Sequence, residues 1–233
     1  MNIQFPQSLV KNLESKSDSK QAEIGKKYMK SQLVFYGLKI PMIRKLVSDF
    51  LKYNKNISIK QFYPGLNKLW KSHVFDQMAA ALFILEKFTK EFDETTWKLL
   101  DKWIDDLDNW TLCDWMCTLR VKMVDQDRQK LTLLMEWTHS PHMWRRRSAI
   151  ISTLKLKRFN TSLKVNDIEP LILSLLEDRP AFGNKKEFFI QKAIGWLLRS
   201  YGDFEPEAVL TFANTHRDQM SPLAYREATR KLQ

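Results

Sequence analysis

The chain has 233 residues, and 44% of them are hydrophobic, which is enough to bury a core within one domain or one continuous array of repeats. Its 38 Lys and Arg residues outnumber 27 Asp and Glu residues, and the resulting charge of +11 favours a polyanionic partner, either nucleic acid or an anionic membrane surface. No stretch reaches the roughly 18 apolar residues of a membrane-spanning helix, and the first residues lack a signal-peptide pattern, so we expect a cytoplasmic protein.

Apolar residues recur at helical spacing along almost the whole chain, and no run alternates as a strand would. The pattern predicts an all-α fold in a single domain, residues 1–233. Helix breaks are expected at residues 37–41, 53–58, 64–65, 105–109, 140–141, 178–183 and 202–206. Their loose period of about 35 to 45 residues favours antiparallel helix pairs stacked as a HEAT-like solenoid, with an irregular helical bundle as the alternative.

The first helix with local support is expected to begin at Asn109, capped by the carboxylate of Asp108. Its core stripe consists of Leu112, Met116, Leu119 and Met123. Trp110 and Asp114 lie one turn apart, nearly opposite that stripe, and are therefore expected on one non-core face. In the structural interpretation, Trp110 packs on a neighbouring repeat beside a solvated Asp114. In the functional interpretation, Trp110 and Asp114 belong to a functional site.

Cys113 and Cys117, the only cysteines, lie one turn apart on the same helix and cannot form a disulfide framework. A zinc site that combines them with His139 and His142 is the alternative. Its spacing matches no standard ligand pattern, so we expect small buried side chains and no metal.

The second helix is expected to have Ser140 as its cap and Pro141 at its first position, with a core stripe of Met143, Ile150, Ile151 and Leu154. Arg147 falls within that stripe. Because a guanidinium cannot shed its charge, Arg147 must meet a carboxylate, a phosphate or open water. An internal ion pair and a contact with a nucleic-acid phosphate are both compatible with this position.

Basic and acidic residues are segregated along the chain. Residues 86–108 are predominantly acidic, whereas no acidic residue interrupts the cations Arg145, Arg146, Arg147, Lys155, Lys157 and Arg158. A solvated basic face is the plain interpretation. A track that binds phosphates is the functional one.

The third helix is expected over residues 187–201, with a core stripe of Ile190, Ile194, Leu197, Leu198 and Tyr201. Trp196 is off this stripe, with Lys192 four residues before it and Arg199 three residues after it. An aromatic ring between cations can lie against a sugar or base while the cations bind phosphates. Packing of Trp196 between helices is the structural alternative.

Together these segments resemble the AlkD family of bacterial DNA glycosylases over nearly the whole chain. The blocks that carry the resemblance are Tyr28-Met29-Lys30, Phe35-Tyr36-Gly37 with Pro41, Trp110-Thr111-Leu112-Cys113-Asp114, residues 144–150, Glu187-Phe188-Phe189-Ile190-Gln191-Lys192-Ala193-Ile194-Gly195-Trp196 and residues 222–228. The resemblance implies a right-handed α-solenoid of antiparallel HEAT-like repeats whose concave basic groove holds double-stranded DNA.

The resemblance also implies a catalytic role for Asp114 between Trp110 and Trp196, a DNA-backbone contact for Arg147 and a place in the cleft for Tyr28. Family members remove N3- and N7-alkylated purines without base flipping. Alkylation gives the purine a positive charge that weakens its glycosidic bond, so one carboxylate that stabilises the developing sugar cation suffices.

We therefore expect a monomeric, monofunctional alkylpurine DNA glycosylase that leaves an abasic site and needs no cofactor. Lys192 and Arg199 are expected to bind DNA beside Trp196. Two alternatives belong to other classes: a non-catalytic HEAT-like protein that recognises damaged or branched DNA, and a HEAT-like scaffold that binds an acidic protein. Salt-sensitive binding to duplex DNA separates the scaffold from the other two.

Overall fold

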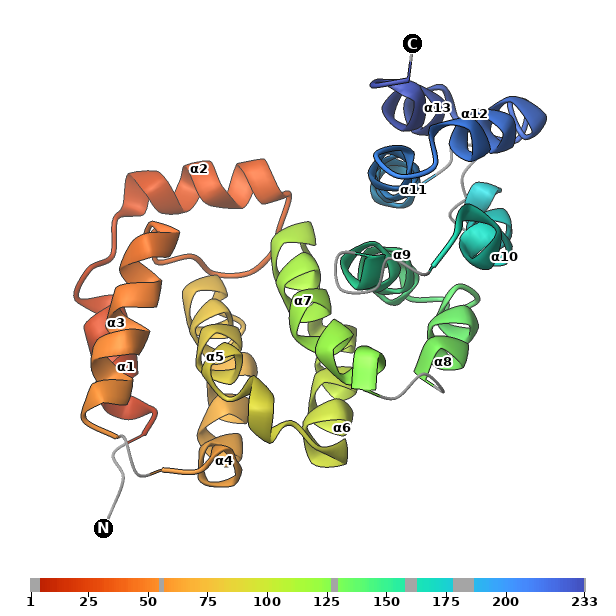
Figure 1. Cartoon of the computed structure of the whole chain (residues 1–233). Coiled ribbons are helices and arrows are strands. Elements are labelled where there is room, and N and C mark those ends of the chain that lie inside the picture. Colours follow the sequence, from red (N-terminus) through yellow and green to blue (C-terminus); the bar gives the residue numbers. More distant parts are fainter. Residues whose placement is uncertain (1–4, 55–56, 127–129, 158–162, 178–186, 233) are drawn as a thin grey trace. The chain divides into compact units, whose positions relative to one another are not determined.

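A computed structural model of the chain describes residues 5–54, 57–126, 130–157, 163–177 and 187–232 (Figure 1). These residues form thirteen α-helices and two short 3-10 helices, and their only β-type pairing is an isolated bridge between Val34 and Val74. The prediction of an all-α fold is confirmed. None of the helices in these ranges is long and apolar enough to cross a bilayer. The chain divides into two compact units, Met1–Leu119 and Arg120–Gln233.

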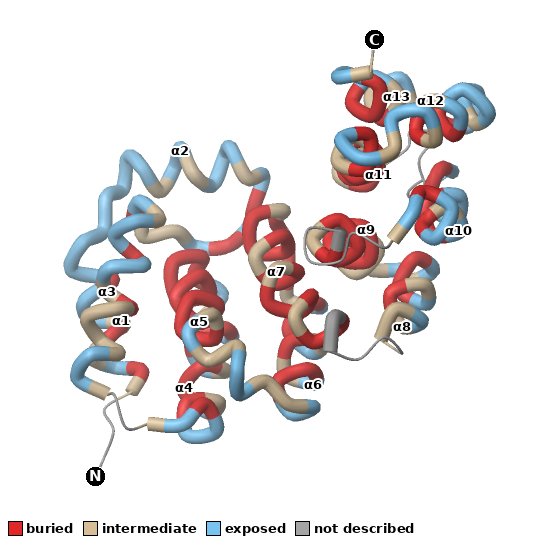
Figure 2. Tube along the Cα trace, in the orientation of Figure 1, coloured by how far each residue is buried: buried red, intermediate tan, exposed pale blue. Residues whose placement is uncertain are grey.

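The first unit is built around one helix that is buried along most of its length. Its helices are α1 (Gln7–Glu14), α2 (Ser19–Met29), α3 (Ile40–Lys52), α4 (Ile59–Trp70), α5 (Phe75–Lys87), η1 (Thr89–Glu91), α6 (Glu94–Trp103), η2 (Ile104–Asp106) and the first part of α7 (Trp110–Gln126). Helix α5 packs against α1, α3 and α4, and its residues 75–85 are all buried (Figure 2). This burial follows from a sequence that is apolar on nearly every side.

Helix α2 differs from its neighbours because it contains no buried residue. It runs crosswise to α3, α5 and α7 (Figure 1). Its side chains Ile24 and Tyr28 are 53% and 70% exposed. The chain that follows turns back sharply at Gly37, whose φ is 85°. A Cβ there would lie 2.2 Å from the carbonyl oxygen of Asp18, so only glycine fits this turn.

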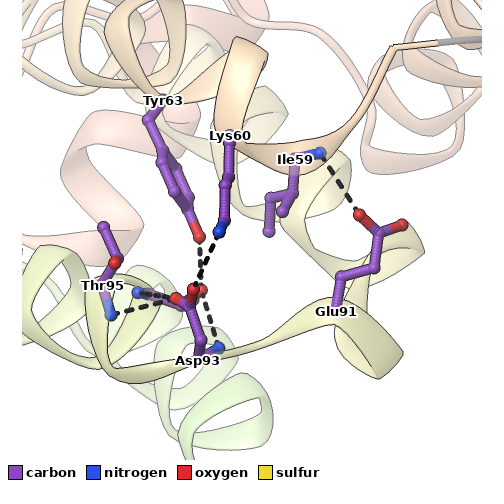
Figure 3. Close-up of polar contacts among 7 residues, drawn as sticks. Ile59, Lys60, Tyr63, Glu91, Asp93 and Thr95 are labelled. Carbon is purple, nitrogen blue, oxygen red and sulfur yellow. Dashed lines mark hydrogen bonds and ion pairs between the residues drawn. The ribbon is translucent and has the colours of Figure 1, made fainter.

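Polar side chains join the starts of α4 and α6 (Figure 3). Asp93 caps α6 by accepting hydrogen bonds from the backbone N–H groups of Thr95 and Thr96 at 2.9 and 3.1 Å. Glu91 accepts one from the N–H of Ile59, the first residue of α4, at 3.4 Å. Carboxylates are stabilising at helix N-termini, where unpaired N–H groups and the helix dipole favour negative charge. Glu91 and Asp93, from the predominantly acidic segment at residues 86–108, therefore stabilise the starts of these helices.

The second unit is built around α11. Its helices, after the last part of α7, are α8 (Lys130–Trp137), α9 (Met143–Lys157), α10 (Val165–Leu176), α11 (Phe188–Gly202), α12 (Pro206–Thr215) and α13 (Pro222–Thr229). Helix α11 packs against α9, α10, α12 and α13. The predicted helix is confirmed, because its whole core stripe is buried, namely Ile190, Ile194, Leu197, Leu198 and Tyr201.

Close packing of α11 on α13 depends on Gly195. A Cβ at this position would lie 2.6 Å from the Cβ of Glu227 and 2.9 Å from the carbonyl oxygen of Ala224. Both distances are shorter than atoms can approach without displacement. The missing side chain of Gly195 therefore sets the separation of the two helices and brings Glu227 beside α11.

The predicted break at residues 64–65 is wrong, because both residues lie inside α4. Pro64 is the sixth residue of that helix and removes only one intrahelical hydrogen bond. Burial of the helix on both sides of Pro64 offsets this loss, and Gly65 leaves room for the ring of Phe5, which a Cβ would meet at 2.0 Å. Pro170 has the same place in α10.

The remaining predicted breaks are confirmed at their described residues. Residues 55–56 and the whole break at residues 178–183 lie outside the described residues. Helix α9 begins two residues later than predicted, at Met143. Ser140 does not cap the helix itself. Its Oγ instead accepts a hydrogen bond from the N–H of His142 at 3.2 Å, within the turn that precedes α9.

Candidate nucleic-acid interface

The first group of predicted site residues lies at the start of α7. This helix begins at Trp110, and the Oδ1 atom of Asn109 caps it by accepting a hydrogen bond from the N–H of Leu112 at 3.0 Å. The prediction that Asp108 is the cap is therefore wrong. The carboxylate of Asp108 instead binds residues 31–33, which follow α2.

Asp114 lies one turn after Trp110 and is buried, with 9% of its surface exposed, whereas Trp110 is half-buried. A solvated aspartate, the structural interpretation of the sequence, does not describe this position. The reason is that α7 is buried well beyond the predicted stripe of Leu112, Met116, Leu119 and Met123. The other buried residues of the helix include Cys113, Cys117 and Val121, so the expectation of buried cysteines is confirmed.

Two predicted residues of the first unit are in contact. The ring of Tyr28, in the last turn of α2, meets the ring of Trp110 edge to face, with centroids 5.8 Å apart and planes at 77°. Edge-to-face pairs of this kind are favourable because the positive edge of one ring faces the negative surface of the other. Since Tyr28 is largely exposed, the pair presents an aromatic surface next to the helix that carries Asp114.

An open pocket of about 340 Å³ adjoins Tyr28, and its walls include Ile24, Met29, Phe35 and Pro41. Asp76 also lines the pocket and is 1% exposed. The carboxylate of Asp76 accepts hydrogen bonds from the N–H groups of Tyr36 and Leu38 at 2.7 and 3.0 Å. Burial raises the pKa of Asp76, and these hydrogen bonds act in the opposite direction. Asp76 thus holds the turn that forms one wall of the pocket.

The second group of predicted residues lies in the second unit. Trp196 is half-buried on the flank of α11, outside the core stripe, as the sequence predicted. The Nζ atom of Lys155, on α9, lies 5.6 Å from the centroid of the Trp196 ring. This cation–π contact places a positive charge over an indole face.

Both predicted cations beside Trp196 are held by one carboxylate of α13. Glu227 accepts a hydrogen bond from the Nζ atom of Lys192 at 2.9 Å and a second from the guanidinium of Arg199. The hydrogen bond from Lys192 is the main reason that the pKa of Glu227 is lowered, with burial acting against it. The side chains of Lys192 and Arg199 remain 44% and 22% exposed. Lys192 and Arg199 are therefore both paired with Glu227 and partly accessible to solvent.

Arg147 is buried, with 4% of its surface exposed. Its Nη1 atom donates a hydrogen bond to the carbonyl oxygen of Phe189 at 2.7 Å, which connects α9 to the first turn of α11. The ring of Phe189 also packs against Trp144, with centroids 5.1 Å apart. Arg147 thus has a structural function at the junction between α9 and α11.

The neighbouring cations also have partners within the second unit. Arg146 donates to the carbonyl oxygens of Ser140 and Pro141 at 2.8 and 2.9 Å, and the guanidinium of Arg145 lies 5.5 Å from a ring centroid of Trp137. The side chain of Lys157 and the whole of Arg158 lie outside the described residues. The basic run thus contributes to the fold of this unit before any ligand is bound.

The sequence interpretation missed Asp108 and Glu227 as residues that organise these two groups. The sequence predicts that Asp108 caps its own helix, although Ser31, Gln32 and Leu33, which donate hydrogen bonds to it, lie 75 to 77 positions away. Glu227 belongs to the block at residues 222–228, but nothing near it in sequence identifies partners 28 and 35 positions away. Local periodicity gives the face of a helix and carries no signal for such distant partners.

The described residues thus form an all-α fold in which a buried carboxylate, that of Asp114, lies one turn from a pair of aromatic rings. A family profile described as DNA alkylation repair enzyme matches residues 9–232, and the chain belongs to that family. A solved structure described as a predicted DNA alkylation repair enzyme from Enterococcus faecalis is similar, with a TM-score of 0.77 and 23% identity over 93% of this chain and 96% of that one. At this identity the likeness shows the fold. No curated protein matches the chain.

Proposed function

We propose that this protein is a monofunctional DNA glycosylase that hydrolyses the N-glycosidic bond of cationic N3- or N7-alkylated purines in duplex DNA. It acts without base flipping and leaves an abasic site. The observation that carries the proposal is the burial of Asp114 one turn from Trp110, whose ring is paired with the exposed ring of Tyr28. Membership of the DNA alkylation repair enzyme family supports the same substrate class.

The reaction requires little from the protein because the leaving group is already activated. The bond from C1′ to the purine nitrogen breaks, its electron pair neutralises the purine, and positive charge develops on the deoxyribose. The Asp114 carboxylate stabilises that charge and orients a water molecule that attacks C1′. A proton of this water then passes to solvent. A buried carboxylate is suited to this role because charge interactions strengthen where water is excluded.

The aromatic and basic side chains account for binding in this proposal. Trp110 and Trp196 provide rings for the sugar, and the Trp196 ring already has a cation over one face. Tyr28, Arg147, Lys192 and Arg199 bind the DNA. In the same proposal the chain is one domain, a right-handed α-solenoid of antiparallel HEAT-like repeats with a concave basic groove. It acts as a monomer in the cytoplasm and needs no cofactor.

Chromatography of free bases tests the proposed reaction. Duplex DNA carrying N7-methylguanine or N3-methyladenine is incubated with excess protein, and abasic sites are counted by alkaline cleavage of the same samples. The proposal expects free alkylpurine and abasic sites in equal amounts, without strand cleavage before alkali. If the protein binds duplex DNA in a salt-sensitive way but releases neither base, the glycosylase proposal is wrong and a non-catalytic DNA-binding function is favoured.

A further inference from the structure

The carboxylate of Asp108 gathers hydrogen bonds from the segment that follows α2. Its oxygens lie 2.7 and 2.9 Å from the Oγ of Ser31, and it accepts bonds from the N–H groups of Gln32 and Leu33 at 2.6 and 3.2 Å. The Nδ2 atom of Asn109 adds a further bond at 3.0 Å. Hydrogen bonds to a carboxylate are stronger than those between neutral groups, so this set fixes the segment firmly.

These bonds connect the two helices that carry the aromatic pair. Residues 31–33 follow directly on the last turn of α2, which holds Tyr28, and Asp108 directly precedes Asn109, the cap of α7, which begins at Trp110. The contact between Tyr28 and Trp110 therefore depends on how the end of α2 is held against the start of α7.

Burial contributes little to holding the end of α2 in place. The helix has no buried residue, so the burial of apolar side chains that anchors α5 is missing here. Lys30, which ends α2, has a left-handed φ of 53°, and Ser31 after it is buried. The bonds to Asp108 therefore anchor the chain directly after a helix that contains no buried residue.

We infer that Asp108 is a positioning residue of the candidate site: by fixing residues 31–33 it holds Tyr28 against Trp110 and so shapes the aromatic surface beside Asp114. This inference rests on the proposed function. Asp108 acts through the two rings and does not itself contact the substrate. Its loss is therefore expected to impair base release more than binding of undamaged DNA, because displacements of about 1 Å can reduce a rate by up to about 100-fold.

The test compares Asp108→Asn with Asp106→Asn, a matched change in the same connection. The carboxylate of Asp106 accepts hydrogen bonds from Trp70 and Lys71, at the end of α4, and not from the segment that follows α2. Single-turnover release of N7-methylguanine is measured for both variants, together with affinity for undamaged duplex. We expect at least about a 10-fold slower release for Asp108→Asn alone, with similar affinities for both variants.

Two further measurements make the outcome decisive. Adding Tyr28→Ala is expected to slow release by wild-type protein but to slow Asp108→Asn much less, because both changes remove the same ring placement. Amide hydrogen exchange over residues 28–38 is expected to speed up in Asp108→Asn and not in Asp106→Asn. If Asp108→Asn fails to fold, Ser31→Ala removes one bond of the set and takes its place.

Equal release by the two Asn variants, or an equal effect of Tyr28→Ala in both backgrounds, overturns the positioning role. If the wild-type protein releases no base, the proposed reaction fails, and the exchange comparison still decides whether Asp108 holds this segment. Unchanged exchange in Asp108→Asn would overturn the inference in that case as well.

Discussion

At the scale of single residues, Arg147 carries a permanent charge in a position that is 4% exposed. Its hydrogen bond to the carbonyl oxygen of Phe189 has a stabilising function that is independent of DNA. Arg147→Ala removes this hydrogen bond from a charged donor together with a buried side chain, and we expect the free energy of unfolding to fall by about 1–3 kcal/mol. Denaturant titration measures this change.

Arg145→Ala is the matched control, because it removes an arginine of the same helix that lies over the ring of Trp137. We expect a smaller loss of stability for this variant. An Arg147→Ala protein as stable as wild type would contradict the structural function. If Arg147 also binds a phosphate, the same variant weakens duplex binding and reduces the salt dependence of affinity by about one counterion.

Sequence reasoning located these residues better than it identified their partners. The position of Trp196 outside a core stripe and of Arg147 inside one followed from helical spacing. The burial of Asp114 did not, because α7 is packed on more sides than one stripe implies. Partners on other helices, such as Glu227 for Lys192 and Arg199, depend on tertiary packing that spacing cannot encode.

At the scale of helices, the contact of α11 with α13 depends on the glycine at position 195. Gly195→Ala places a Cβ 2.6 Å from that of Glu227, and the helices must move apart. Overpacking of this kind costs about 1–3 kcal/mol, against a gain in helix propensity of up to about 1 kcal/mol. We therefore expect a lower midpoint of denaturation.

Gly202→Ala is the control for Gly195→Ala within the same helix. Its Cβ would come closest to the flexible end of the Leu232 side chain, at 3.2 Å, and Leu232 can move. The denaturation midpoint of Gly202→Ala is expected to stay close to that of wild type. Equal effects of the two substitutions would show that close approach at Gly195 does not limit the packing of α11 on α13.

The ion pairs between α11 and α13 predict a dependence of stability on pH. The pKa of Glu227 is lowered in the folded protein, chiefly by its hydrogen bond from Lys192. Such a carboxylate stabilises the fold above its unfolded pKa of about 4.3, and the contribution is lost as pH falls through the lower folded pKa. We expect wild type to exceed Glu227→Gln in stability at pH 7, with a difference that shrinks in acid.

Thermal melting of both proteins across a pH series measures this difference. Lys231, which pairs with Asp203 at 2.9 Å on an exposed surface, offers a control through Asp203→Asn, for which we expect little change. A constant difference between wild type and Glu227→Gln from neutral to acidic pH would mean that the ionised carboxylate of Glu227 does not stabilise the contact.

Breaks in apolar spacing predicted only part of the helix boundaries, since the connections at residues 71–74 and 216–221 were not predicted. Two of the errors have local causes. The sequence Pro64-Gly65 is a common turn signal, yet here Pro64 lies early enough in α4 to be tolerated and Gly65 admits the ring of Phe5. Asp108 and Asn109 are both residue types that cap helices well. Asn109 is the cap here because the carboxylate of Asp108 is hydrogen-bonded to residues 31–33. Such choices depend on contacts between elements.

At the scale of the whole molecule, the charge of +11 predicts how binding to DNA responds to salt. Each phosphate neutralised releases counterions, so the logarithm of affinity falls with the logarithm of salt concentration at about −0.9 per contact. With several cations contributing, we expect undamaged duplex to bind about 100-fold or more weakly when salt is raised from 50 to 200 mM. Fluorescence anisotropy with labelled duplex measures this slope, and affinity independent of salt would contradict binding through phosphates.

The central claim is that Asp114 performs the chemistry, and Asp114→Asn tests it most directly because it removes the charge with little change in size. The measurement is release of N7-methylguanine from duplex DNA by wild type and by this variant, with protein in excess over DNA. We predict that the variant melts and binds undamaged duplex like wild type but releases the base at least about 100-fold more slowly. Release by Asp114→Asn at the wild-type rate would contradict the account.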